Sequence, residues 1–178
     1  MMKFSLHKLI EENQENEFIF FWGHQPSKDG TITKTCFSQW WLSSFVVNKV
    51  TYESAEHWMM AKKAELFGDE IQLKNILSDL SPANAKKYGR KVKDFDPLTW
   101  EEKAYQIVVE GNFHKFYQNA ELTKFLLSTG NKVIVEASPF DKIWGIGTDK
   151  HLEDPKEWKG TNLLGFALME VREELKRQ

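Results

Sequence analysis

The stretch that decides the fold is Tyr52–Gly68, which reads YESAEHWMMAKKAELFG. Ser54 is a favourable N-cap, because its hydroxyl accepts a hydrogen bond from an amide of the first turn, and Gly68 is a typical helix stop. We therefore predict a helix from Ser54 to about Phe67. Its inward-facing residues would be Ala55, Trp58, Met59 and Leu66.

Helical signals continue after this segment. Ser81-Pro82 marks a helix start, since serine caps and proline fits the first helical position. Thr99 and Glu102 have the spacing of a capping box and open the longest predicted helix. In all, we predict helices over Asp69–Leu77, from Ser81 onward, from Thr99 to about Tyr117, over Glu121–Leu127 and from about Asn162 to Lys176.

Residues that favour β-strands gather near the N-terminus, after a short amphipathic helix that ends at Glu12. The segments 18–22, 31–36 and 45–52 suggest one small sheet, and Val133–Val135 reads as a further strand. The predicted fold class is a helix-dominated α+β fold. It would form a single domain over residues 1–178, with a small N-terminal β-sheet and a multi-helical core.

Composition excludes several classes of protein. Cys36 is the only cysteine, so no disulfide can form within the chain, and no apolar run approaches the roughly 18 residues of a membrane span. We expect a cytoplasmic protein. The net charge of −2 gives no overall signature of duplex binding. The five histidines show no metal-ligand spacing, so we predict neither a metal nor a cofactor.

The first candidate for chemistry lies on the Ser54 helix. Glu56, Met60 and Lys63 are spaced at i, i+4 and i+7 and share one face. A carboxylate and an ammonium on one stripe suit an anionic, sugar-containing ligand. An ordinary solvated stripe explains the same spacing.

The second candidate is the segment Pro139–Gly147, which follows the predicted strand at 133–135. Loops at strand ends often carry functional groups, and two glycines permit close approach to a ligand. A plain turn in which Asp141 caps backbone amides is the alternative.

The third candidate is Gly160–Gly165, which leads into the last predicted helix. Free amides at a helix N-terminus can bind an anion. Simple capping by Thr161 or Asn162 is the alternative.

These segments together resemble the YbiA-like family, also called NADAR (NAD- and ADP-ribose-associated), over roughly residues 18–174. The resemblance is carried by Phe37-Ser38-Gln39-Trp40, Tyr52–Trp58, Ala61–Ala64, Ser81-Pro82, Gly89-Arg90, Trp100, Lys115-Phe116, Thr129-Gly130, Ile134–Glu136, Asp141, Trp144–Gly147 and Gly160–Gly165. It implies a YbiA-like fold and a metal-independent N-glycosidase.

The resemblance also implies roles for individual residues. Glu56, Asp141 and Trp100 match catalytic positions. The predicted substrate-binding residues are Lys63, Arg90, Trp22, Gly23, His24, Ser38, Trp144, Gly145 and Asn162.

Family members act on two kinds of substrate, and the resemblance implies either for this chain. One is ADP-ribosylated guanine or guanosine, possibly carried on modified nucleic acid, and the other is a phosphoribosylamino-pyrimidine intermediate of riboflavin synthesis. Gln39-Trp40 stands where the bacterial enzymes more often carry Asn-Phe, and the segment 26–34 looks longer than theirs, so the substrate stays open. A non-catalytic sensor of ADP-ribose or a related nucleotide is the alternative function.

Overall fold

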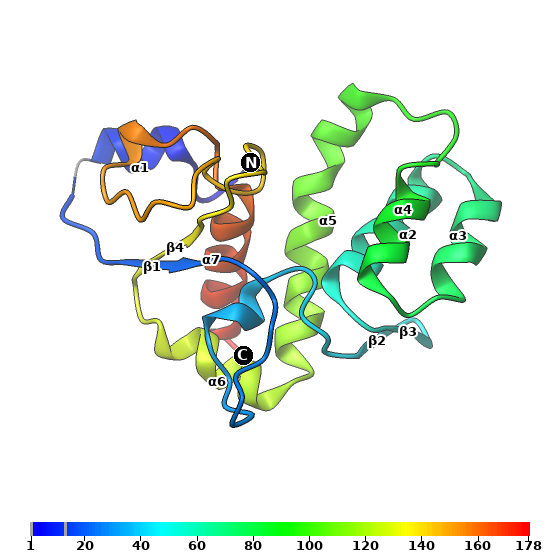
Figure 1. The fold of residues 1–178 in the computed structure, drawn as a ribbon, viewed down its shortest axis with the longest axis horizontal. Coiled ribbons are helices and arrows are strands. Elements are labelled where there is room, and N and C mark those ends of the chain that lie inside the picture. The colour runs from blue at the N-terminus through cyan, green and yellow to red at the C-terminus, as the bar shows by residue number, and fades with distance from the viewer. Residues whose placement is uncertain (1, 13) are drawn as a thin grey trace. The chain divides into compact units, whose positions relative to one another are not determined.

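The computed structural model describes residues 2–12 and 14–178 and is dominated by helices, as predicted (Figure 1). The chain divides into two compact units, and each is described by itself. The first comprises Met1–Ser38 and Glu121–Gln178, and the second comprises Gln39–Ala120.

A two-stranded parallel sheet organises the first unit. β1 (Phe18–Phe21) pairs with β4 (Val133–Glu136), with Phe18 opposite Val133 and Phe21 opposite Glu136. The helix α7 (Leu163–Leu175) packs on β4. Gly165 permits this contact, because a Cβ at that position would lie only 2.0 Å from the Ile134 carbonyl oxygen. The remaining elements are α1 (Leu6–Glu12), the 3-10 helices η1 (Lys34–Phe37) and η2 (Pro155–Glu157), and α6 (Ala120–Ser128).

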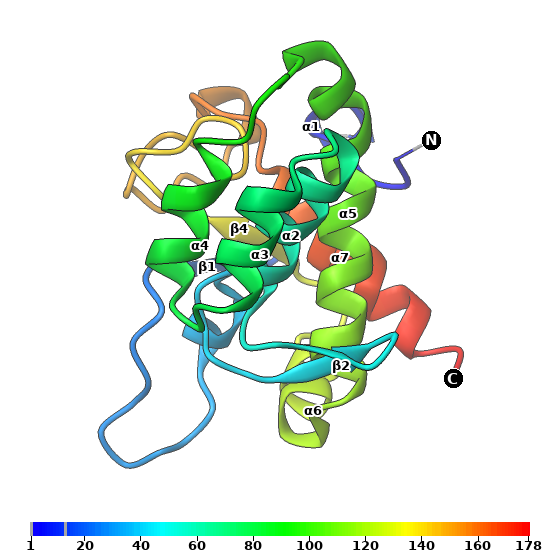
Figure 2. The same ribbon diagram turned by 90° about the vertical axis from the view of Figure 1, so that its right-hand side faces the viewer.

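Four helices and one hairpin build the second unit. The hairpin joins β2 (Phe45–Val47) to β3 (Val50–Tyr52). Asn48 and Lys49 both have positive φ, as a tight two-residue hairpin turn requires. Figure 2 shows α2, α3 and α4 side by side. The helices are α2 (Ala55–Leu66), α3 (Glu70–Leu77), α4 (Pro82–Gly89) and α5 (Pro97–Tyr117).

The helix α2 is the core element of the second unit, and every residue from 55 to 61 is buried. Two glycines bring neighbouring helices close to it. A Cβ at Gly89 of α4 would meet the Met60 sulfur at 2.2 Å, and one at Gly111 of α5 would meet the Trp58 ring at 2.3 Å. The Trp58 indole also donates a hydrogen bond to the Ile107 carbonyl at 2.9 Å, so α5 is fixed against α2.

The predicted N-terminal sheet differs from the observed strands. Residues 31–36 do not form a strand: Cys36 and Ser38 donate to the carbonyls of Thr33 and Thr35, which makes the 3-10 turn that buries Cys36 and Phe37. The segments 18–22 and 45–52 do not share a sheet either, because β1 takes its partner from β4, more than a hundred positions along the chain. Sequence pattern identifies strand-forming residues but not their partners.

Helix starts were largely predicted correctly. Ser54 and Ser81 are N-caps as expected, and their hydroxyls accept from His57 and Asn84. The longest helix was the exception. Its cap is Asp96, which accepts from the Thr99 amide at 2.7 Å, and Pro97 is its first residue. The capping box at Thr99 was therefore wrong, because the aspartate before proline starts the helix earlier.

Candidate functional site

Glu56 lies in the first turn of α2 and is 6% exposed. The Ser54 hydroxyl caps this turn by accepting from the His57 amide at 3.1 Å. The Glu56 amide donates to the Gln39 carbonyl at 2.9 Å. A carboxylate this buried does not belong to a solvated stripe, so the structure excludes that alternative for Glu56. A negative charge at a helix N-terminus is favoured by the helix dipole.

Lys63 lies two turns further along α2, between aromatic rings. Its ammonium is 4.0 Å from the centroid of the Phe95 ring and 5.4 Å from that of Trp100. Partial burial lowers the pKa of Lys63, and the negative charge of Glu56 opposes this shift. Lys63 thus interacts with two other predicted site residues, with Glu56 through its charge and with the Trp100 ring through a cation–π contact. Desolvation makes the lysine charge act more strongly on any ligand it meets.

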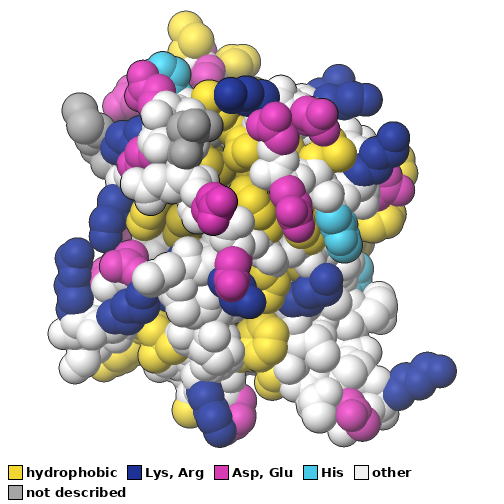
Figure 3. All heavy atoms as spheres, turned by 90° about the vertical axis from the view of Figure 1, so that its left-hand side faces the viewer, with side chains coloured by type: hydrophobic (Ala, Val, Ile, Leu, Met, Phe, Trp, Pro, Cys, Tyr) yellow, Lys and Arg dark blue, Asp and Glu magenta, His cyan; other side chains and the backbone are white. Residues whose placement is uncertain are grey.

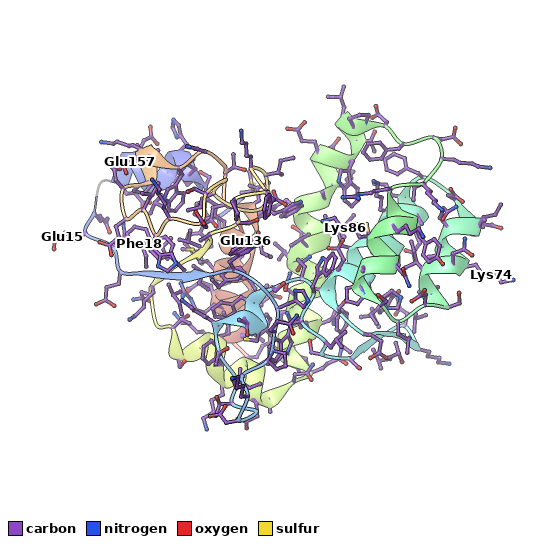
Figure 4. All side chains as sticks on the ribbon, in the orientation of Figure 1. Glu15, Phe18, Lys74, Lys86, Glu136 and Glu157 are labelled. Carbon is purple, nitrogen blue, oxygen red and sulfur yellow. The ribbon has the colours of Figure 1, made fainter. Side chains whose placement is uncertain are left out.

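Two further predicted site residues belong to other helices, Trp100 to α5 and Arg90 to the end of α4. Trp100 stands in the first turn of α5 and is half-buried, so its ring keeps an accessible part. Arg90 follows the last residue of α4 and is exposed. Lys86, on the same helix (Figure 4), lies 5.6 Å from the centroid of the Trp40 ring. The last turn of α4 therefore places one cation, Lys86, beside an indole, and the exposed Arg90 follows it in the chain.

His57, next to Glu56, serves the fold. It is completely buried, and its Nδ1 accepts from the Glu53 amide at 3.2 Å. Its Nε2 lies 2.8 Å from the Ile76 carbonyl oxygen, which assigns the proton to Nε2. Burial lowers the pKa of His57, so the neutral imidazole is favoured. Both ring nitrogens are committed to backbone partners, and His57 is not a candidate base.

Asp141, in the first unit, caps its own loop. Its Oδ1 accepts from the amides of Ile143 and Trp144 at 2.8 and 2.7 Å. The turn that was the alternative for this segment is therefore present. One carboxylate oxygen is used in it, and the residue stays partly exposed. This geometry fixes Trp144 relative to Asp141 and leaves the catalytic assignment a prediction.

Of the two alternatives for the start of α7, anion binding is contradicted by the backbone hydrogen bonds. The amides of Leu163 and Leu164 donate to the carbonyls of Ile143 and Trp144 at 3.2 and 3.0 Å, so they are not free for a ligand. Capping by the Asn162 side chain is also absent. Gly145 belongs to this backbone contact, because its carbonyl accepts from the Asn162 amide at 3.1 Å. A Cβ at Gly145 would also lie 2.8 Å from the Glu136 carbonyl oxygen.

Asn162 joins α7 to the sheet. It has φ 55° and is completely buried. Its Oδ1 accepts from the amide of Glu136, the last residue of β4 (Figure 4), and its Nδ2 donates to the Ile134 carbonyl, both at 2.9 Å. The side-chain amide is thus occupied by backbone groups. This geometry favours a positioning role, and the predicted substrate contact is not tested by it.

Three of the remaining predicted residues, Trp22, Gly23 and His24, directly follow β1. Trp22 is 52% exposed, and its ring centroid lies 6.2 Å from that of Phe140. Gly23 has φ 80°, a conformation that glycine tolerates, and the partly buried His24 follows. Ser38 comes directly after η1, and its amide donates to the Thr35 carbonyl at 3.1 Å.

Sequence reasoning missed two aromatic residues. Phe95 forms the closer wall around Lys63, and Phe140, 87% exposed, lies against Trp22. Both stand one residue before an aspartate that caps a turn or a helix, Asp96 and Asp141. The available signal was an apolar ring directly before an aspartate, because aspartate is a frequent cap and a core position is not expected beside it.

A separate groove in the first unit lies between α1, residues 14–18 and residues 153–156. Leu9, Ile10 and Phe18 line it together with acidic residues. Figure 3, which faces this side of the molecule, shows hydrophobic side chains exposed among acidic ones. None of the predicted site residues lines this groove.

The structure describes residues 2–12 and 14–178. In these ranges no three His, Cys, Asp or Glu side chains converge as a metal site would require. No helix within the same ranges is long and apolar enough to cross a membrane.

Comparison with known proteins defines the class. N-glycosidase R617 of Acanthamoeba polyphaga mimivirus is 44% identical over 169 residues, which cover 90% of this chain and 98% of that protein. N-glycosidase YbiA of Escherichia coli is 34% identical over 129 residues, or 72% of this chain and 74% of YbiA. The NMR structure of YbiA superposes with a TM-score of 0.73 at 30% identity and covers 92% of this chain and 88% of the YbiA chain.

The fold and these relatives define the class of YbiA-like N-glycosidases. The NADAR domain matches residues 20–176, and the chain belongs to that family. The maize riboflavin biosynthesis protein PYRR is 34% identical over 133 residues, which cover 70% of this chain and 20% of PYRR. The family predicted from the sequence motifs is thereby confirmed.

Proposed function

We propose that the protein hydrolyses the C1′–N bond of a nucleotide-like substrate. The substrate would be ADP-ribosylated guanine or guanosine, free or on modified nucleic acid, or a phosphoribosylamino-pyrimidine. The observation that carries the proposal is the buried carboxylate of Glu56 on the same helix as Lys63, whose ammonium lies against Phe95 and Trp100. The names of R617 and YbiA as N-glycosidases support the reaction type.

Glu56 would carry the central step. Breaking the C1′–N bond develops positive charge on the sugar and negative charge on the leaving base. A carboxylate about 4 Å from the cationic sugar gains about 4 kcal/mol at an effective dielectric near 20. That corresponds to roughly three decades in rate. The same carboxylate would then activate water for attack at C1′.

The other residues would bind and orient the substrate. Lys63 and Arg90 would hold phosphate, and the half-buried ring of Trp100 would stack on the base. Asp141 would orient the sugar hydroxyls or the attacking water. No step in this scheme requires a metal, so we propose a metal-independent reaction.

To decide between the two substrate classes, wild type and Glu56→Gln are incubated with ADP-ribosyl-guanosine and with a phosphoribosylaminopyrimidine. Release of the free base, followed by chromatography, is expected from one of the two with wild type and not with Glu56→Gln. If neither substrate releases base while both proteins bind ADP-ribose, the protein is a nucleotide sensor rather than a hydrolase. Unchanged turnover after addition of a chelator is expected, and loss of turnover would refute metal independence.

A further inference from the structure

The start of α2 is held by a residue outside the helix. The first amides of a helix have no partner within it, and each needs an acceptor from elsewhere. Ser54 supplies one by accepting from His57, and the Gln39 carbonyl supplies another by accepting from Glu56 itself. The backbone position of the proposed catalytic carboxylate therefore depends on where the Gln39 carbonyl lies.

Gln39 is anchored to a different helix. The residue is 9% exposed, and its Oε1 accepts from Nδ2 of Asn112 on α5 at 2.7 Å. Its Nε2 has a weaker sulfur partner in Met59 at 3.8 Å. Gln39 thus connects α5 to the first turn of α2: its side chain is hydrogen-bonded to Asn112, and its backbone carbonyl is hydrogen-bonded to the Glu56 amide.

Asn112 places a polar side chain in the core, and burying a polar group costs free energy unless it is fully hydrogen-bonded. It is completely buried, and its Nδ2 divides its two hydrogens between Gln39 and the Val108 carbonyl, the latter at 2.9 Å. Its Oδ1 has no hydrogen-bond partner among the described residues. A buried acceptor without a partner loses its solvation and gains nothing in return. An apolar residue at position 112 would avoid this cost, so stability does not explain the amide.

We infer that Gln39 and Asn112 are positioning residues that fix Glu56 for catalysis. The inference rests on the proposed function, because it assumes that Glu56 takes part in the reaction. Asn112 holds the Gln39 side chain against α5, and the Gln39 carbonyl then holds the first turn of α2. A reacting group misplaced by about 1 Å can lose on the order of 10²-fold in rate, so a smaller displacement of Glu56 is expected to lower kcat.

The double variant Gln39→Met/Asn112→Leu tests the inference. Replacing both partners of a buried hydrogen bond by apolar groups of similar size leaves stability nearly unchanged. We expect a urea midpoint at or above that of wild type and a kcat about 10-fold lower. KM should stay within roughly two-fold, because ground-state binding is not removed. Gln118→Met is the matched control, since that amide binds the Val46 backbone and not Gln39.

Hydrogen exchange of the Glu56 amide, followed by NMR, gives a readout besides activity. It should be faster in the double variant and unchanged in Gln118→Met. A double variant with wild-type kcat and wild-type Glu56 exchange would overturn the inference. If wild type turns over neither substrate, the proposed function fails, and with it the catalytic part of the inference. The exchange rates alone then decide whether the pair positions the Glu56 backbone.

Discussion

The ammonium of Lys63 lies 4.0 Å from the centroid of the Phe95 ring, and burial lowers the pKa of that lysine. A desolvated cation costs free energy in the folded protein and is tolerated where it has a task. The cation–π contact with the aromatic face offsets part of this desolvation free energy. The arrangement leaves the charge available to an anionic ligand.

We expect Lys63→Met to retain or raise the free energy of unfolding, because the penalty for desolvating the ammonium disappears. Substrate binding should weaken on the order of ten-fold, the loss of one hydrogen bond to a charged group. Urea unfolding and KM check the two effects. Lys62→Met is the matched control: Lys62 pairs with Glu65 at 2.7 Å and lies over Trp58. A KM that rises equally in both variants would contradict a specific role for Lys63.

The variant Asp141→Asn distinguishes the structural role of Asp141 in its turn from its proposed catalytic role. An asparagine Oδ1 can still accept from the amides of Ile143 and Trp144, so the loop should keep its conformation while the charge is lost. We expect kcat to fall by roughly 10²-fold, the scale of one acid–base or orienting group, with little change in stability. Asp154→Asn, at a cap that accepts from Lys156, is the control and should keep full activity. Near-normal turnover of Asp141→Asn beside an inactive Glu56→Gln would eliminate the two-carboxylate scheme.

The stability of the protein should depend on His57 below about pH 6.5, the ordinary pKa of the imidazole. The folded-state pKa of His57 is lowered by burial, so the unfolded chain takes up a proton first as the pH falls below the ordinary value of 6.5. Folded stability is therefore full above that pH and decreases below it, by at most about 1.4 kcal/mol per pH unit. Urea unfolding at several pH values measures the slope. The slope should shrink in His57→Gln, and an equal slope in both proteins would assign it to other groups.

Asn162→Ala should lower the free energy of unfolding. It removes both hydrogen bonds to β4 and places alanine at φ 55°, and we expect a loss of about 3 kcal/mol. Asn48→Ala is the control for backbone strain, since Asn48 has φ 50° in an exposed turn, and it should cost about 1 kcal/mol. Thermal or urea unfolding gives both values. A large rise in KM with unchanged stability would instead support the predicted substrate contact.

The sequence by itself determined the helices and most of their starts, the start of α5 excepted. Ser54 and Ser81 cap helices by bonding amides three positions away, and Gly68 has positive φ just after α2 ends. Because these interactions are local, they can be predicted from the sequence. The family motifs were likewise readable as residue strings, and the NADAR match over 20–176 confirms them. The spacing of Glu56 and Lys63 on one helix follows from the same local geometry.

Only the tertiary structure decided which distant residues meet. The pairing of β1 with β4, the packing of Phe95 on Lys63 and the anchoring of Gln39 by Asn112 each join segments far apart in the chain. The occupied amides at the start of α7 also depend on the loop at Ile143. Burial and hydrogen-bond partners of this kind arise from the whole fold, because the free energy of a polar group depends on what surrounds it in space.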